Sequence, residues 1–257
     1  MRFPLLTFTV CLICTIANSS HSQLWVGSDD FNAPTLNSSK WITITGLSEG
    51  LVKTSSAISF QNGGYTGELY GMTAWAQPLP LNASWTAQIN AKINPSFNTG
   101  VTGGFGNGKY LEALFAVVSD LSTFQYNFTN ILRRDNNTEI SYQFSDQGFW
   151  PYTQGDTPTN MTDVILRFDY TSATKTIKSS YADSNTPSIF NDTYTWNISP
   201  YTGISQMYVA IGGYSYGINV PSETMIMDNF MIIPEPSAVS LLAVGLGGLV
   251  MMRRRRS

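Results

Sequence analysis

The sequence predicts an all-β body folded as a two-sheet antiparallel sandwich, and three observations support this prediction. Aromatic residues make up 13% of the 257 residues and charged residues only 12%, about half the usual charged share of ~25%. Thr, Tyr, Phe and Trp favour strands, and the abundant Gly, Asn and Ser favour turns. Several segments alternate apolar and polar residues, and no long stretch has helical periodicity. Short strands separated by such turns are typical of a sandwich.

The clearest expected strand is Ala83–Ile93, because every second residue from Trp85 onward is apolar and the residues between are polar. Val164–Tyr170 alternates in the same way, and the turn Thr171–Thr174 with the returning segment Lys175–Tyr181 predicts a hairpin. Leu111–Ser119 is apolar on both faces, as a central strand would be, although its Ala, Leu and Glu residues also suit a short helix. Further strands are expected at Leu51–Phe60, Leu69–Ala76, Phe124–Ile131, Ile140–Phe144, Met207–Gly212 and Thr224–Ile232.

Residues 1–22 have the features of a secretory signal peptide. Arg2 forms a short positive region, Phe3–Ile16 is apolar but too short to span a bilayer, and small residues follow. Cleavage after Ala17 or after Ser22 would place small residues at the required positions. We therefore expect export by a Sec-type machinery and a folded domain at 23–233.

The C-terminal segment, 234–257, has three parts in order. An uncharged span, Ser237–Met252, precedes a terminal cluster of arginines. Sixteen helical residues cover about 24 Å, and snorkelling arginines help such a span to fit a hydrocarbon core of ~30 Å. The arginines would hold the C-terminus in the cytoplasm and leave the body outside. The motif residues are Pro234, Glu235 and Pro236, and the cluster is Arg253, Arg254, Arg255 and Arg256.

This arrangement resembles the PEP-CTERM sorting signal of Gram-negative bacteria. The resemblance implies a transient inner-membrane anchor, processing by an exosortase-type protease near the motif, and transfer of the body to the cell surface or extracellular matrix. Such proteins often accompany the production of extracellular polysaccharide. The alternative is a single transmembrane helix at 237–252 that anchors the protein permanently.

The body resembles concanavalin-A-like (laminin-G-like) jelly-roll domains. Asp29-Asp30-Phe31-Asn32, followed by Leu36 and Lys40-Trp41, is similar to their opening, and Asp228-Asn229-Phe230 is similar to their closing strand. Ile165–Tyr181 is similar to their paired strands. The resemblance implies that the first and last strands lie side by side. Because this fold hosts lectins, glycosidases and adhesive modules, it does not determine a function.

Composition excludes several classes of function. Cys11, Cys14 and His21 all lie in the N-terminal segment, so the body contains no Cys nucleophile, no Ser-His-Asp triad, no Cys/His zinc site and no disulfide. The five arginines of the end segments leave nine basic residues in the body against 17 acidic ones. An acidic domain is a poor partner for nucleic acid, so no such partner is expected.

A carboxylate pair is the main catalytic arrangement left, as in glycosidases. The nearest pairs in the sequence are Glu223 with Asp228, which would face opposite sides of one strand, and Asp163 with Asp169, about 20 Å apart along a strand. Neither fits a glycosidase site, and ordinary surface carboxylates explain both pairs better.

Two kinds of binding site are conceivable. Asp29, Asp30 and Asp228 would form a structural calcium site if the first and last strands bring them together. The alternative is that all three are solvated aspartates at strand ends. Aromatic faces stack on sugars, and aromatic residues occur in the loop 147–160 and in a second loop, Gly212–Gly217. These residues would bind a saccharide, or they would simply cap an open end of the sandwich. The aromatic residues in question are Phe149, Trp150, Tyr152, Tyr214 and Tyr216.

The sequence thus predicts an exported, non-catalytic domain that is structural or binds a saccharide such as an extracellular polysaccharide. The alternative is a secreted glycoside-active enzyme that uses a carboxylate pair.

Overall fold

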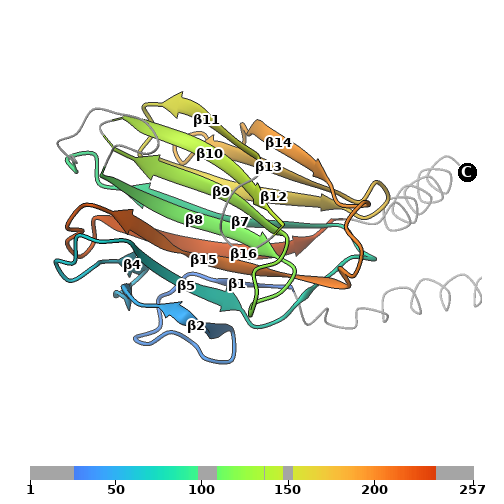
Figure 1. Ribbon diagram of the computed structural model, residues 1–257, viewed down its shortest axis with the longest axis horizontal. Coiled ribbons are helices and arrows are strands. Elements are labelled where there is room, and N and C mark those ends of the chain that lie inside the picture. The colour runs from blue at the N-terminus through green and yellow to red at the C-terminus, as the bar shows by residue number, and fades with distance from the viewer. Residues whose placement is uncertain (1–25, 98–108, 136, 147–152, 236–257) are drawn as a thin grey trace, which may run out of the picture.

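The computed structural model describes residues 26–97, 109–135, 137–146 and 153–235. Every regular element in these ranges is a β-strand, and the strands form two antiparallel sheets. The predicted two-sheet sandwich is therefore confirmed (Figure 1). In the described part of the chain, no helix is long and apolar enough to cross a membrane. The predicted signal peptide, 1–22, and the predicted transmembrane helix, 237–252, lie outside the described residues.

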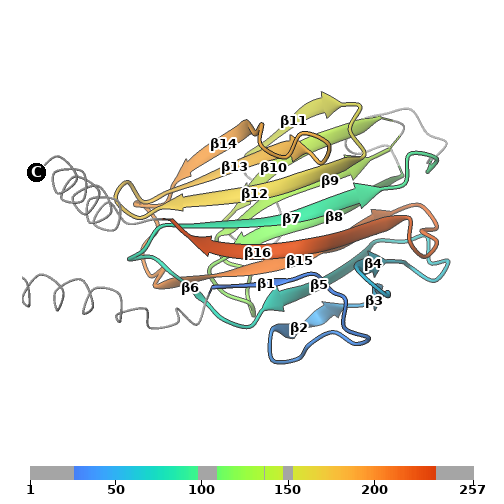
Figure 2. The ribbon, with the colours of Figure 1, turned by 180° about the vertical axis from the view of Figure 1, so that it is seen from behind.

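The first sheet, called sheet A, is in front in Figure 2. Its order is β14-β13-β12-β7-β16-β4-β3, and β1 also pairs with β16. The strands are β1 (Gly27–Asp29), β3 (Leu51–Lys53), β4 (Ile58–Phe60), β7 (Trp85–Ile93), β12 (Asp163–Thr171), β13 (Thr176–Asp183), β14 (Asn191–Asn197) and β16 (Met225–Pro234).

The second sheet, called sheet B, is in front in Figure 1. Its order is β11-β10-β9-β8-β15-β5-β2, and β6 also pairs with β15. The strands are β2 (Trp41–Ser48), β5 (Leu69–Trp75), β6 (Leu79–Pro80), β8 (Tyr110–Val118), β9 (Asn127–Arg134), β10 (Thr138–Ser145), β11 (Thr153–Thr159) and β15 (Gln206–Tyr216).

The main core lies between the sheets, because alternating strands direct their apolar side chains to one face. Trp85 and Ile93 of β7 are fully buried there, as are Phe115 of β8 and Phe168 of β12. The rings of Phe115 and Phe168 meet across the two sheets with 5.3 Å between their centroids. A second apolar cluster, which includes Met72, lies on the outer face of sheet B.

Most of the expected strands are confirmed, and one correction has a clear cause. Leu111–Ser119 forms strand β8, central in sheet B as its two apolar faces predicted, and the alternative of a short helix is wrong. Leu51–Phe60 is two strands, β3 and β4, because a turn reverses the chain where Thr54 N–H donates to the carbonyl of Ala57 at 2.9 Å. Strands β2, β6, β11 and β14 were not expected from the sequence, and β1 was expected only through the jelly-roll resemblance.

The first and last strands lie side by side, as the jelly-roll resemblance implied. Gly27 lies opposite Ile232 and Asp29 opposite Phe230 in the antiparallel pair β1–β16. The beginning of β1 and the end of β16 are therefore at the same end of the sandwich. We call this the terminal end, and the opposite one the distal end.

Proline is unusual within a sheet, yet Pro234 of the motif is the last residue of β16 and lies opposite Trp85. The N–H of Glu235 then donates to the carbonyl of Ser84 at 3.1 Å. Hydrogen bonds alternate between the two sides of an antiparallel strand, so the nitrogen of Pro234 faces away from β7. On that side β1 pairs only as far as Gly27 opposite Ile232, which is why a residue without an N–H is tolerated here. Pro236 and Arg253–Arg256 lie outside the described residues.

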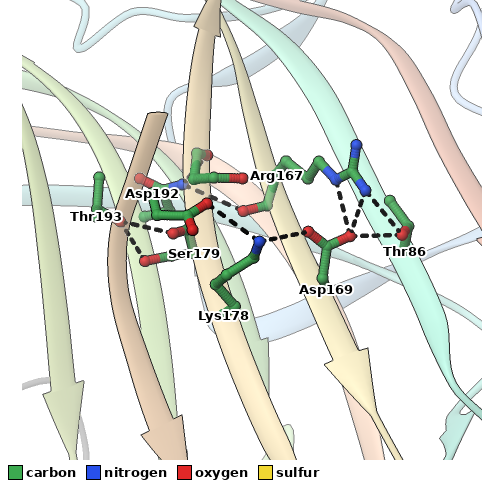
Figure 3. A network of polar contacts seen from close by, with 9 residues as sticks. Thr86, Arg167, Asp169, Lys178, Ser179, Asp192 and Thr193 are labelled. Carbon is green, nitrogen blue, oxygen red and sulfur yellow. Dashed lines mark hydrogen bonds and ion pairs between the residues drawn. The ribbon is translucent and has the colours of Figure 1, made fainter. Parts of the chain in front are cut away.

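The outer face of sheet A carries a network of ion pairs and hydrogen bonds (Figure 3). Asp169 of β12 accepts a hydrogen bond from the hydroxyl of Thr86 at 2.6 Å and pairs with Arg167 at 2.7 Å. Lys178 lies 4.0 Å from Asp169 and 3.1 Å from Asp192. These carboxylates are thus already engaged with cations, which is typical of a structural surface network.

Candidate functional site

The outer face of sheet B carries an unusual row of polar side chains across five neighbouring strands. Tyr70, Tyr214, Glu112, Arg133 and Glu139 lie opposite one another in successive strand pairs, from β5 to β10. They point outward, because their neighbours along the strands belong to the core between the sheets. Neighbouring strands are about 4.8 Å apart, so these side chains are in contact range.

Glu112 and Arg133 form a buried ion pair within this row. Arg133 Nε lies 3.7 Å from Glu112 Oε1. The side chain of Arg133 is 3% exposed and that of Glu112 is 6% exposed. Among the residues that the structure describes, Glu112 Oε1 has no hydrogen-bond partner. Burial raises the pKa of Glu112 to about 7, while the charge of Arg133 opposes this shift and the charges of Asp156 and Glu139 add to it. A perturbed carboxyl of this kind is frequent at functional sites.

Two tyrosines join this ion pair to a second carboxylate. The guanidinium of Arg133 lies 4.3 Å from the ring centroid of Tyr110, whose hydroxyl donates to the hydroxyl of Tyr214 at 3.2 Å. Tyr214 donates in turn to Glu68 Oε1 at 3.0 Å. Burial raises the pKa of Tyr214, so it stays protonated and remains a donor.

Tyrosine rings pack tightly around Tyr214. The ring of Tyr70 stacks on that of Tyr214 with 4.0 Å between centroids. Tyr216, which is 46% exposed, lies over Tyr110 at 5.8 Å. We call the whole group the tyrosine–carboxylate cluster: Glu68, Tyr70, Tyr110, Glu112, Arg133, Tyr214 and Tyr216.

Glu68 also lines a hollow of about 570 Å³ beside the cluster. The hollow is of a size common for small-molecule sites, which span about 300–1,000 Å³. Tyr65 is 56% exposed and presents its ring there. We call this cavity the distal hollow, and its lining residues are Glu49, Gly50, Val52, Gln61, Asn62, Gly63, Tyr65, Glu68 and Leu69.

The floor of the distal hollow is built by a close approach of two backbone segments. Gly50 has a φ of 80°, and a Cβ at this position would lie 2.6 Å from the carbonyl oxygen of Gln61. The N–H of Gln61 donates to the carbonyl of Gly50 at 2.8 Å. Asn62 is buried, and its amide bonds to the backbone of Ile218 and Val220. Only glycine at position 50 allows this geometry.

The distal hollow lies at the end of the sandwich opposite to Gly27 and Pro234. Gln61 follows Phe60, which lies opposite Met225, the first residue of β16. Pro234, the last residue of β16, is at the terminal end. At about 3.3 Å per residue, the length of β16 places roughly 30 Å between the two ends.

The predicted aromatic binding residues are placed differently from the expectation. Tyr214 and Tyr216 were assigned to a loop, but both lie in strand β15, and Tyr214 is only 5% exposed. The glycines that suggested a loop are needed by packing instead: a Cβ on Gly213 would lie 2.4 Å from the ring of Phe60. Phe149, Trp150 and Tyr152 lie outside the described residues.

The three predicted calcium ligands do not assemble. Among the described residues, no group of three or more acidic, His or Cys side chains could hold a metal ion. The carboxylate of Asp29 accepts hydrogen bonds from Trp41 Nε1 and from the backbone N–H of Phe31, both at 2.9 Å. Asp30 is exposed and bonds to Asn32. Asp29 and Asp30 line a hollow of about 410 Å³, but Asp228 is not part of its lining.

The carboxylate pairs of the sequence also stay apart from the cluster. Asp163 pairs with Lys92 at 3.2 Å, and Asp169 belongs to the network of Figure 3. Glu223 is exposed ahead of β16, whereas Asp228 is half-buried within it, and burial raises the pKa of Asp228.

Sequence reasoning missed Glu68, Glu112, Arg133 and Tyr65. One signal was present, since Glu112 is the only charged residue in the otherwise apolar stretch Leu111–Val118. A charged side chain in a central strand needs a partner or a function.

No protein-family model matches the chain, and no curated protein sequence matches it. Solved structures match it by fold. The CBM2 module of the evolved Dit protein of Lactobacillus casei BL23 phage J-1 has a TM-score of 0.56 at 8% identity, over 80% of this chain and 94% of that one. The winged bean acidic lectin, solved with methyl-α-D-galactose, has a TM-score of 0.52 at 11% identity, over 80% of this chain and 97% of that one.

A mutant of the GH43 protein BlXynB from Bacillus licheniformis is also similar, with a TM-score of 0.54 at 11% identity over 80% of this chain. The match covers only 39% of the length of that protein. Likeness at such low identity shows the concanavalin-A-like jelly-roll sandwich alone, because this fold carries both lectins and glycoside hydrolases.

Proposed function

We propose that the protein is an exported saccharide-binding domain, and that its ligand binds in the distal hollow against Tyr65 and beside Tyr216. The observation that carries this proposal is Glu68, which lines the hollow on one side and accepts a hydrogen bond from Tyr214 on the other. An exposed aromatic ring next to oriented carboxylate and amide groups suits a sugar, whose C–H face stacks on the ring while its hydroxyls form hydrogen bonds.

The terminal segments complete the proposal. Residues 234–257 resemble a PEP-CTERM sorting signal. Such a signal would hold the protein in the inner membrane until an exosortase-type protease releases it to the surface or matrix. Because the distal hollow lies at the end of the sandwich away from Pro234, it would face outward before and after release.

The alternative, a glycoside-active enzyme, would use Glu68 and Glu112 as its carboxylate pair. Tyr214 lies opposite Glu112 and bonds to Glu68, so its ring stands between the two carboxylates. A sugar would have to displace this packed ring to reach both groups. This arrangement supports binding over hydrolysis.

Binding is tested by titrating the full-length protein with neutral, acidic and basic polysaccharides in a calorimeter. Tyr65→Ala and Tyr216→Ala should each weaken binding by about fivefold or more, since a stacked ring contributes about 1 kcal/mol or more. Tyr194→Ala is the matched control, because Tyr194 is 38% exposed but lies on β14 at the other edge of the molecule. Release of reducing ends that Glu68→Gln or Glu112→Gln abolishes would instead establish the enzyme.

A further inference from the structure

The charges that line the distal hollow are all of one sign. Glu49 and Glu68 line it, and both are exposed to solvent. Within the described ranges of the chain, no lysine or arginine belongs to its lining. In the described part of the chain, none of the ion pairs involves either carboxylate.

The nearest lysines in the sequence are engaged elsewhere. Lys53 of β3 donates to the carbonyl of Thr54. Lys40 donates to the carbonyl of Ser28 at 2.8 Å. Neither lysine lines the hollow, and no ion pair among the described residues joins a cation to Glu49 or Glu68, so the two carboxylates face solvent uncompensated there.

The same cavity presents an aromatic face and an amide. Tyr65 is 56% exposed and follows the permissive pair Gly63-Gly64, both with positive φ. Gln61 is half-buried in the lining and can donate to or accept from a hydroxyl. A ring face attracts a cation as well as a sugar C–H surface, with about 0.5–1 kcal/mol at an exposed site.

We infer that the distal hollow selects a cationic amino sugar, such as a polymer of deacetylated hexosamine, over neutral and anionic saccharides. This inference rests on the proposed function, because it specifies the ligand of the same site. The ammonium group of such a sugar would lie between Glu49 and Glu68, while its ring stacks on Tyr65. A uronate would instead bring a third negative charge into the hollow, and like charges in a shared site repel.

The test compares three oligosaccharides of equal length by calorimetry with the full-length protein: a glucosamine oligomer, its N-acetylated form, and a uronate oligomer. The glucosamine oligomer should bind about tenfold or more tightly than the N-acetylated one, and its affinity should fall as salt is raised. The uronate oligomer should bind most weakly.

Charge-neutral variants locate the effect. Glu49→Gln and Glu68→Gln should each reduce affinity for the glucosamine oligomer several-fold and leave that for the N-acetylated oligomer nearly unchanged. Glu68→Gln keeps an acceptor oxygen for Tyr214, so it preserves the cluster. Asp192→Asn, which removes a surface charge from β14, should change neither affinity.

The outcomes separate the inference from the proposed function. Equal or tighter binding of the N-acetylated or uronate oligomer would overturn the inference and leave saccharide binding in place. Preference for the glucosamine oligomer that survives both glutamate substitutions would also overturn it, since the cation site would lie elsewhere. Binding of no saccharide at all would overturn the proposed function itself.

Discussion

Arg133 Nε lies 3.7 Å from Glu112 Oε1 on the outer face of sheet B, and both side chains are almost completely buried. Such a pair is costly to break from one side, because the remaining charge stays buried without its partner. The pair also supports Tyr110, over whose ring the guanidinium of Arg133 lies.

Glu112→Ala should therefore lower the free energy of unfolding by about 3–5 kcal/mol. Glu139→Ala, in the same row but only half-buried, should lower it by less than about 1 kcal/mol. Urea denaturation of both variants measures the difference. Equal losses would mean that the ion pair with Arg133 is not a significant part of the stability.

Stability should fall as pH rises from about pH 5 to about pH 8. Burial raises the pKa of Glu112 from 4.5 to about 7, so the folded state binds a proton that the unfolded state has lost. The stabilisation is complete below the unfolded pKa and is lost as pH rises through the folded pKa. Burial raises the pKa of Glu139 and Asp228 in the same direction.

Melting temperatures of the wild type and of Glu112→Gln across this window provide the check. The variant should show a much flatter pH profile, because the amide does not titrate. Exposed Asp30 and Asp120, whose pKa values are lowered by hydrogen bonds, act only in more acidic solution and do not affect the comparison. An unchanged slope in the variant would assign the pH dependence to other groups.

Gly50→Ala should destabilise the protein by about 2 kcal/mol or more and disturb the distal hollow. An alanine Cβ would meet the carbonyl oxygen of Gln61 at 2.6 Å, at a φ of 80°. Gly63→Ala is the matched control, since Gly63 also has a positive φ, 58°, but has no atom within 4 Å of the added Cβ. It should cost about 1 kcal/mol, and thermal unfolding distinguishes the two.

The mature protein from its native host should end near Pro234–Ser237 and lack Arg253–Arg256. The span Ser237–Met252 is short and contains three glycines, which makes it a marginal permanent anchor. Mass spectrometry of the C-terminal peptide tests this prediction. Replacing the four arginines with neutral residues should impair processing, and a mature peptide that retains Ser257 would show a lasting anchor.

The strand pattern of this protein was determined locally by the sequence. Trp85, Ile89 and Ile93 alternate with polar residues in β7, and a period of two depends only on the chain itself. The hairpin of β12 and β13 was equally local, because its turn separates two adjacent strands. The pairing of the first and last strands was predicted from the family resemblance, because no local pattern in the sequence indicates it.

The candidate site was decided only by the tertiary structure. Glu112 and Tyr214 are far apart in the sequence, and they become neighbours because β8 pairs with β15 in one particular register. A shift of one residue would turn Tyr214 inward and separate it from Glu68. No local pattern sets that register, which depends on how distant strands pack together. For the same reason, Gly212 and Gly213 made Tyr214 and Tyr216 look like loop residues. In the fold, Gly212 lies close to the backbone of Gly71 in β5 and Gly213 close to the ring of Phe60 in the facing sheet, so strand β15 needs glycine at both positions.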